Sequence, residues 1–423
     1  MDKSFIIFLA IPVFFLLMIV ELTYGILTGK NNYRLNDTIT SINTGLISRF
    51  PTLLNLGFQG MVFSYAATSL NLGLLPESSP LTWIFAFILY DLCYYWMHRL
   101  HHEYKLLWAT HVVHHHGEEF NLSTAMRQTS TGFLWKWIFF LPMLMAGVPA
   151  KVFVAVGGLN LVYQFWVHTV HIGKLGWYEK YFITPSNHRI HHAKNPEYID
   201  ANYGGVFIIW DRIFGTYIEE KDDLKPVYGT VKALRSWNPL WANVEVFFSM
   251  LRDSYHTAKW SDKLRVWIAP TRWRPEDVAE RFPSNPEHIG FTEKYDPQAP
   301  GPYRAYTWIQ AVCNPVIAIL VFFSIPQQTF TETAIFGSLL LAGSAVMSFI
   351  LAGKPGGLIT DALKSLFAIS VCALGAMNVD LWATQALLLQ SAINLLVVPV
   401  VLIISHRTGN GSSTAPVHYV GDG

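Results

Sequence analysis

Cysteine and charge are both scarce in this chain of 423 residues. Its three cysteines, Cys93, Cys313 and Cys372, lie in apolar runs without a CxxC pair, which argues against a disulfide framework and a cysteine-based zinc site. Charged residues make up 14% of the chain, against about 25% in a typical soluble domain. The net charge of only +1 excludes binding driven by bulk attraction to nucleic acid. With 52% hydrophobic residues, the composition also excludes a disordered chain.

Long apolar runs take the place of charge. A bilayer-spanning helix needs about 20 mostly apolar residues, and the sequence predicts such helices at 5–28, 51–72 and 81–97. A cleavable signal peptide is the weaker interpretation of the first run, because no small-residue cleavage site follows it. A pair of runs at 133–149 and 150–170 is interpreted either as two full spans or as a shallow hairpin. Four more spans are predicted at 309–325, 333–352, 358–377 and 382–405.

The segment 172–308 is polar and rich in Trp, Pro and charge, and it is predicted to form a soluble cap. Within it, Leu240 to Leu251 has the pattern of an amphipathic helix that lies on the membrane surface. Lys and Arg are absent from the loops at 73–80, 326–332 and 378–381. The positive-inside rule therefore places the opposite face, with the cap, in the cytosol. We expect an all-α integral membrane protein, a bundle of spanning helices under a cytosolic helical cap.

Histidine is the residue type with an unusual distribution. Of 16 histidines, 12 lie between His98 and His192. They form the clusters HRLHHE at 98–103, HVVHHH at 111–116 and HRIHH at 188–192, with His168 and His171 between the last two. Residues at i, i+3 and i+4 share one face of a helix. Each cluster is therefore predicted to present two or three imidazoles in one direction, and helix ends at one membrane face can bring the clusters together.

The number and type of these side chains predict a site for two metal ions. Eight or more imidazoles exceed what one ion can hold. Structural zinc usually takes four ligands that include Cys, and a hydrolytic two-metal site normally includes bridging carboxylates. Imidazole also suits iron, so an all-histidine site at a membrane surface favours iron and oxygen chemistry. His101 and His116 are surplus or fall off the shared faces and are not expected to be ligands.

Two carboxylates accompany the first cluster. Glu103 directly follows His102, and Asp91 lies two helical turns before His98. Each is interpreted either as an ordinary structural or surface carboxylate, or as a partner that orients a ligand imidazole. For Glu103 the functional interpretation includes proton transfer, which makes it the one candidate catalytic side chain.

The histidine motifs and their flanks resemble the fatty acid hydroxylase (sterol desaturase) superfamily and, within it, the alkylglycerol monooxygenases, which cleave ether lipids with tetrahydrobiopterin. The similar stretches are YYW-x-H at 94–98, NLSTAMRQ at 121–128 and IDANYGG to WDRIFGT at 199–216. The resemblance is strongest over 81–220 and weaker to about 275, while the last four spans fit in outline only. It suggests an N-terminal transmembrane region at 1–80, a catalytic domain at 81–220, a cap extension at 221–308 and a C-terminal transmembrane region with a tail at 309–423.

The resemblance implies a set of side chains that hold two iron ions. Eight matched positions are His98, His102, His111, His114, His115, His188, His191 and His192. His168 matches an intermediate family histidine, and His171 is kept as a further candidate ligand because some relatives use a second histidine here. Glu103 corresponds to a glutamate that the family comparison marks as functional. No residue can be assigned to a pterin.

The implied reaction uses O2 and an external electron donor, with tetrahydrobiopterin as the candidate, to hydroxylate the carbon beside an ether oxygen of a lipid from the bilayer. The hemiacetal product then collapses to a fatty aldehyde and a glycerol derivative. A hydroxylase or desaturase of fatty acyl chains, sterols or carotenoids remains an alternative, because the same ligands serve these reactions. A non-enzymatic metal-binding or transport protein is a second alternative, but it predicts histidines inside the spans rather than at their ends. The expected location is the endoplasmic reticulum of a eukaryote or the inner membrane of a bacterium.

Overall fold

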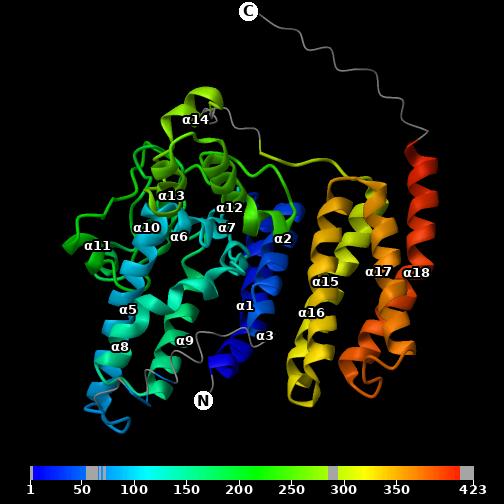
Figure 1. Cartoon of the computed structure of the whole chain (residues 1–423), viewed down its shortest axis with the longest axis horizontal. Helices are drawn as coiled ribbons and strands as arrows, with labels where there is room; N and C mark the ends of the chain where they lie inside the picture. The colour runs from blue at the N-terminus through cyan, green and yellow to red at the C-terminus, as the bar shows by residue number, and fades with distance from the viewer. Residues whose placement is uncertain (1–2, 54–64, 66–67, 70–72, 284–293, 410–423) are drawn as a thin grey trace, which may run out of the picture. The chain divides into compact units, whose positions relative to one another are not determined.

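The computed structural model describes residues 3–53, 65, 68–69, 73–283 and 294–409 (Figure 1). The chain divides into two compact units, Met1–Tyr295 and Asp296–Gly423. Across these described ranges every regular element is a helix, and β-structure is limited to isolated bridges. The all-α prediction is therefore confirmed. Five of the described helices are long and apolar enough to cross a membrane, as expected for an integral membrane protein.

The first unit is built from long helices and many short ones. Its α-helices are α1 (Lys3–Leu27), α2 (Leu35–Ile47), α3 (Phe50–Leu53), α5 (Pro80–Glu103), α6 (Lys105–Ala109), α7 (Val112–His115), α8 (Leu141–Met145), α9 (Ala150–Trp166), α10 (Pro185–His191), α11 (Ile209–Ile213), α12 (Pro239–His256), α13 (Trp260–Ile268) and α14 (Glu276–Arg281). Its 3-10 helices are η1 (Thr124–Met126), η2 (Gly132–Leu134), η3 (Lys136–Phe140) and η4 (Gly176–Lys180).

The spans predicted for this unit meet different outcomes. The run at 5–28 is α1, one of the five apolar helices. The run at 51–72 lies mostly outside the described residues. The run at 81–97 lies in α5 and the run at 150–170 largely in α9, and neither helix is among the five. The run at 133–149 forms η2, η3 and α8 instead of one full span, so of the two interpretations of the pair of runs, two full spans is wrong for this run. Pro142 can begin α8 but cannot continue a helix from η3, and α8 ends before Gly147, which has a positive φ.

Among the described helices of the first unit, α1, α5 and α9 pack together and form its body (Figure 1). Tyr90 of α5 packs against Val152 and Val156 of α9 in a buried apolar cluster. The close approach depends on Gly157, where a Cβ atom would lie 2.9 Å from the Tyr90 ring. α6, α7, α10 and α12 to α14 gather beyond the same ends of the long helices. This arrangement brings all three histidine clusters to one end of the body.

The second unit is a four-helix bundle. It contains α15 (Gly301–Ser324), η5 (Ile325–Gln327), α16 (Phe330–Leu351), α17 (Pro355–Ala373) and α18 (Trp382–Gly409). α15 and α17 each pack on both α16 and α18, and all four helices are apolar enough to span a membrane. The four predicted closing spans are thus confirmed as helices. Amide side chains tie the bundle together, as where Gln310 donates to Asn394 at 2.7 Å.

Candidate metal centre

The first histidine cluster occupies the last turn of α5. His98 and His102 are one turn apart and both are buried. The Nδ1 atom of His98 lies 2.8 Å from the carbonyl oxygen of Tyr203. A carbonyl can only accept, so Nδ1 carries the hydrogen, and Nε2 is left with a free lone pair. Tyr203 therefore fixes both the tautomer and the direction of the His98 ring.

The second cluster lies on α7, a helix of a single turn. His111 precedes its first residue and has non-helical backbone angles, while His114 and His115 end the helix. The Nδ1 atom of His114 donates to the carbonyl of Arg127 at 2.9 Å. Arg127 is itself fully buried and pairs with Asp37 of α2 at 2.8 Å. The buried ion pair thus holds the carbonyl that orients His114.

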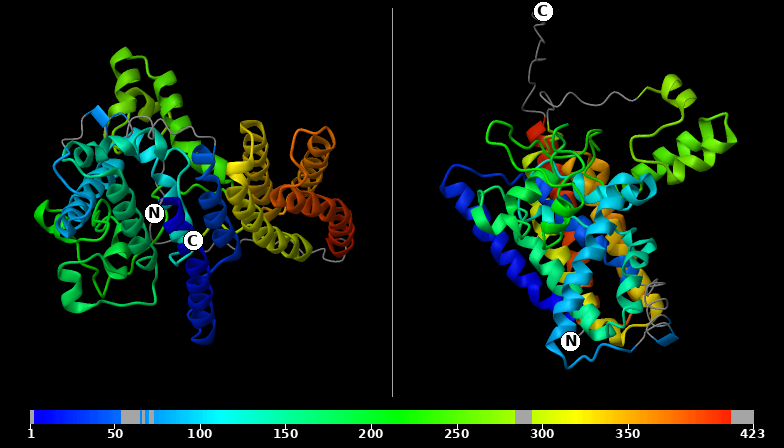
Figure 2. Two further views of the ribbon diagram at one scale, coloured as in Figure 1. Left: turned by 90° about the horizontal axis from the view of Figure 1, so that it is seen from below. Right: turned by 90° about the vertical axis from the view of Figure 1, so that its left-hand side faces the viewer.

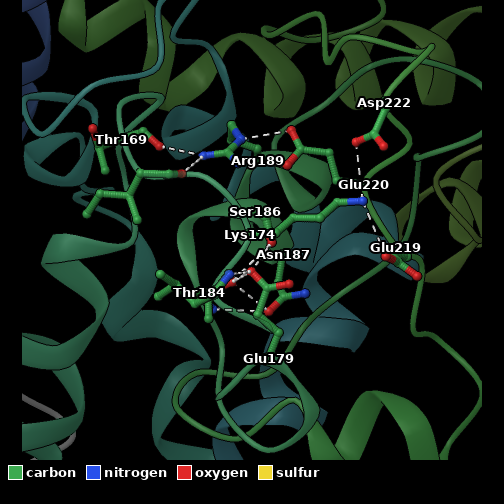
Figure 3. Close-up of polar contacts among 12 residues, drawn as sticks. Thr169, Lys174, Glu179, Thr184, Ser186, Asn187, Arg189, Glu219, Glu220 and Asp222 are labelled. Atoms are coloured by element: carbon green, nitrogen blue, oxygen red, sulfur yellow. Dashed lines mark hydrogen bonds and ion pairs between the residues drawn. The ribbon is translucent and has the colours of Figure 1, made fainter. Parts of the chain in front are cut away.

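The third cluster lies on α10, whose start is fixed by local polar contacts (Figure 3). Pro185 occupies the first turn, where its missing N–H is not needed. The backbone N–H of Thr184 donates to Asn187 at 3.1 Å, and its hydroxyl donates to Glu179 at 2.8 Å. The helix therefore begins at a defined residue, which sets the direction of His188 and His191 within it and of His192 directly after it.

Arg189 joins α10 to its surroundings (Figure 3). Its guanidinium makes a two-pronged contact with Glu220 at 2.9 and 2.7 Å. It also donates to the carbonyls of Thr169 at 3.0 Å and Ile172 at 2.7 Å. Because Thr169 follows His168, one buried arginine connects α10 to the segment that carries the intermediate histidine.

Nine histidines converge into two groups, within each of which the ligand atoms lie within 4.8 Å of one another. The first group is His98, His102, His111, His115 and His191. The second group is His114, His168, His188 and His192. The described residues thus bring together nine of the ten histidines predicted as ligands.

The grouping corrects one prediction. We expected each cluster to point in a single direction, but the two HxxHH motifs divide between the groups. His111 and His115 join the first group and His188 and His192 the second, while His114 and His191 cross to the opposite group. At α10 helical angles explain the division, because residues i and i+4 differ by about 40° around the axis, whereas i+3 and i+4 differ by about 100°. At α7 the direction of His111 is set by the non-helical backbone before the helix. Each motif therefore contributes to both groups.

The imidazole nitrogens that face one another are arranged to bind a cation and not to hydrogen-bond to each other. His114 and His168 both commit Nδ1–H to backbone carbonyls, so their facing Nε2 atoms, 3.3 Å apart, are two lone pairs with no hydrogen between them. His98 and His111 face each other at 2.9 Å, and His188 and His192 at 3.1 Å. Adjacent nitrogen ligands of a metal lie about 3 Å apart when each metal–nitrogen bond is about 2.1 Å. Both groups match that spacing.

Burial keeps these imidazoles in the form that binds metal. It lowers the pKa of His191 to about 3 and that of His114 to about 4. Burial, followed by repulsion between neighbouring imidazoles, lowers the pKa of the other members well below 6.5, as for His111 and His115. All nine rings are therefore neutral at pH 7, as metal ligands must be.

The remaining predicted residues lie outside the two groups. The ring of His171 packs edge-on against Tyr24 of α1, at 5.1 Å between centroids. Glu103 is partly exposed and accepts from Arg99 at 2.8 Å. His101 donates through Nδ1 to the Met97 carbonyl at 2.6 Å, and like His116 it belongs to neither group.

Asp91 and Asp211 fix the loop that supplies the Tyr203 carbonyl. Asp91 is fully buried and accepts from the N–H groups of Val206 at 2.8 Å and Phe207 at 2.9 Å. Asp211 is also fully buried and accepts from the N–H of Tyr203 at 2.7 Å. No sequence pattern singled out a role for Asp211, Arg127 or Arg189. The first two lie in the stretches that carry the family resemblance, which was the available signal.

The comparisons with known proteins agree with this geometry. The fatty acid hydroxylase family model matches residues 83–216, the region that contains every histidine of both groups. Alkylglycerol monooxygenase of Homo sapiens is 34% identical over 87% of this chain and 83% of its own length. The proteins of the same name from Danio rerio and Xenopus tropicalis are 37% and 36% identical, over 71% and 69% of this chain and 67% and 65% of their own lengths. No solved structure matches the chain significantly. Its histidine groups and its relatives together establish that the chain belongs to the fatty acid hydroxylase family.

Proposed function

We propose that this protein is a di-iron membrane monooxygenase that cleaves the ether bond of alkylglycerols. The observation that carries the proposal is the pair of buried, all-histidine groups, each with ligand atoms within 4.8 Å, in a chain whose relatives bear the name alkylglycerol monooxygenase. In this proposal residues 81–220 form the catalytic domain between the regions 1–80 and 221–308, and 309–423 contribute the C-terminal membrane region. The site faces the cytosol.

The two groups would each hold one iron ion. Iron bound there supplies the activation of O2 that breaks an unactivated C–H bond, which no amino-acid side chain can do. The protein contributes rigid placement, because carbonyls of Tyr203, Arg127 and Gln164 orient His98, His114 and His168. It also contributes exclusion of water, because nearly all of the imidazoles are buried.

The reaction balances with an external reductant. A carbon beside an ether oxygen gains one oxygen atom from O2, while two electrons and two protons reduce the other oxygen atom to water. The resulting hemiacetal breaks its carbon–oxygen bond to give a fatty aldehyde and a glycerol derivative. We propose that the reductant is of the class of tetrahydrobiopterin, the donor that the resemblance of the histidine motifs and their flanks implies.

Glu103 is proposed to act at the edge of the first group. Its carboxylate follows His102 directly and is held by Arg99 at 2.8 Å. This position suits a side chain that orients the end of α5 or transfers a proton between solvent and the site. Glu103→Gln should lower turnover more than it lowers protein abundance or iron content. Normal turnover would assign Glu103 to the surface.

The test is an oxygen-uptake assay on the purified chain with iron, tetrahydrobiopterin and an alkylglycerol. We expect fatty aldehyde and O2 consumption in matching amounts, and no activity after His114→Ala. His406→Ala is the matched control, because His406 lies near the end of α18, outside both groups. Turnover of acyl, sterol or carotenoid substrates instead of the ether would contradict the substrate assignment. A purified chain that holds only zinc and shows no turnover after reconstitution with iron would contradict the assignment as an enzyme.

A further inference from the structure

Two helices of the cap, α12 and α13, form an arm that packs on α6. Met250 of α12 and Val266 of α13 meet Ala109 of α6 in a buried cluster. The end of the arm is tied by backbone hydrogen bonds to the end of α5, from Lys105 N–H to the Ala269 carbonyl at 3.0 Å and from Thr271 N–H to the Glu103 carbonyl at 2.9 Å. The arm therefore lies at the level where α5 ends.

The side of the arm away from this cluster is also apolar. On α13, Trp260, Leu264 and Ile268 follow one another at intervals of four residues and are 79%, 74% and 71% exposed. Four residues are one helical turn, so the three side chains form a stripe. On α12 the residues Phe248, Leu251 and Tyr255 are exposed by half or more. We call these six residues the outer face. Large apolar side chains this exposed, three on each of two helices that pack together, mark an interaction surface.

Cations border the outer face. Arg252, Lys259 and Arg265 are exposed on the same two helices or the turn between them. The ammonium of Lys263 lies 5.7 Å from the centre of the Trp260 ring and donates to carbonyls at the end of α12. The nearby Asp277 is occupied by the Ala258 N–H and the Thr257 hydroxyl. The border therefore suits an anionic surface.

Figure 2 shows the arm projecting sideways from the first unit, beside the ends of its long helices. Aromatic and aliphatic side chains bordered by Lys and Arg are typical of helices that lie in a membrane interface. We propose that the arm rests on the bilayer, with its outer face at the boundary between headgroups and acyl chains and its cations on anionic lipid headgroups. The proposal concerns how the cap is seated and is independent of the reaction assigned above.

The test places a spin label on the arm of the full-length protein in nanodiscs containing phosphatidylglycerol. Cys313→Ser removes the accessible native thiol, since Cys93 and Cys372 are buried. Leu264→Cys carries the label, and Glu280→Cys on α14, an exposed polar position of the same cap, is the matched control. We expect the label at 264 to be relaxed by O2 and shielded from a water-soluble nickel chelate, and the label at 280 to show the reverse.

Three outcomes would overturn the proposal. Equal access of the nickel chelate to both labels would show that the arm stands in water. Shielding of the label at 264 from both O2 and the nickel chelate would show that a protein covers the outer face. Dipolar broadening between the labels of two copies would show the same. Unchanged shielding at 264 when phosphatidylcholine replaces phosphatidylglycerol would refute the role of the cations. Iron content equal to that of the unlabelled chain shows that both variants fold.

Discussion

Replacing Arg189 by methionine removes the side chain that connects α10 to the segment that follows His168. Both of these segments place histidines of the second group. Methionine keeps most of the length and the apolar stem but none of the five N–H donors. The Arg189 side chain is 6% exposed, and four of its contacts would be lost: two to Glu220 and one each to the carbonyls of Thr169 and Ile172. The change leaves the Glu220 carboxylate without its partner.

The size of the effect follows from this burial. Removing one partner of a buried ion pair costs about 3–5 kcal/mol. The Glu220 side chain is 16% exposed and can regain some water, so the lower end, about 3 kcal/mol, is expected. For a unit of this size that corresponds to a fall in Tm of roughly 6 °C. The substitution also breaks the link between α10 and the segment that follows His168. Both carry or adjoin histidines of the second group, so metal affinity at that group should fall about 10–100-fold.

The assay pairs thermal unfolding in detergent with iron analysis after dialysis against a chelator. Lys174→Met is the matched control, because Lys174 pairs with Glu219 and Asp222 nearby, but those carboxylates are 65% and 96% exposed (Figure 3). Such exposed pairs contribute little, so the control should leave both Tm and iron content unchanged. If Arg189→Met shifted Tm no more than Lys174→Met and kept its iron, the contacts of Arg189 with Glu220, Thr169 and Ile172 would not stabilise the second group.

Three further changes test other parts of the account. Asp211→Asn exchanges one accepting oxygen for an NH2 group that faces backbone donors, including the Tyr203 N–H, and should cost about 2–3 kcal/mol of unfolding free energy; a denaturation curve that matches the wild type would contradict it. Gly205→Ala should reduce the yield of folded protein, because a Cβ atom there would lie 2.8 Å from a buried carboxylate oxygen; normal yield and iron content would speak against that tight contact. Stability of the metal-free protein should be fully retained above about pH 6.5 and fall as the pH drops towards the depressed pKa values of His114, about 4, and His191, about 3, because the unfolded chain then binds more protons. Iron should be released over the same pH range. A metal-free protein that became more stable on acidification would contradict this prediction.

The histidines that supply the candidate ligands could be predicted from the sequence, because their spacing along the chain is a local property. His98 and His102 lie one turn apart in any helix, and the same holds for His188 and His192. The end of a long apolar helix also places the first cluster near a membrane surface. These features need no knowledge of which segments meet.

The division of the histidines into two groups could not be predicted from local spacing. It depends on where α7 begins, since His111 stands before a helix of a single turn, and on how α10 lies against the distant segments that Arg189 contacts. Arg189 and Asp211 are single charged residues in polar segments, and their roles arise only from contacts with distant residues. His171 shows the converse, because it shares the sequence neighbourhood of His168 but turns towards Tyr24.

The most direct test of the central claim is the metal content of the purified, iron-reconstituted chain in nanodiscs, measured together with its Mössbauer spectrum. We expect one iron ion for each of the two histidine groups. The double variant His111→Ala/His115→Ala should lose the ion of the first group, and His188→Ala/His192→Ala that of the second. A wild-type chain that holds a single ion, or variants that both retain the full iron content, would contradict it.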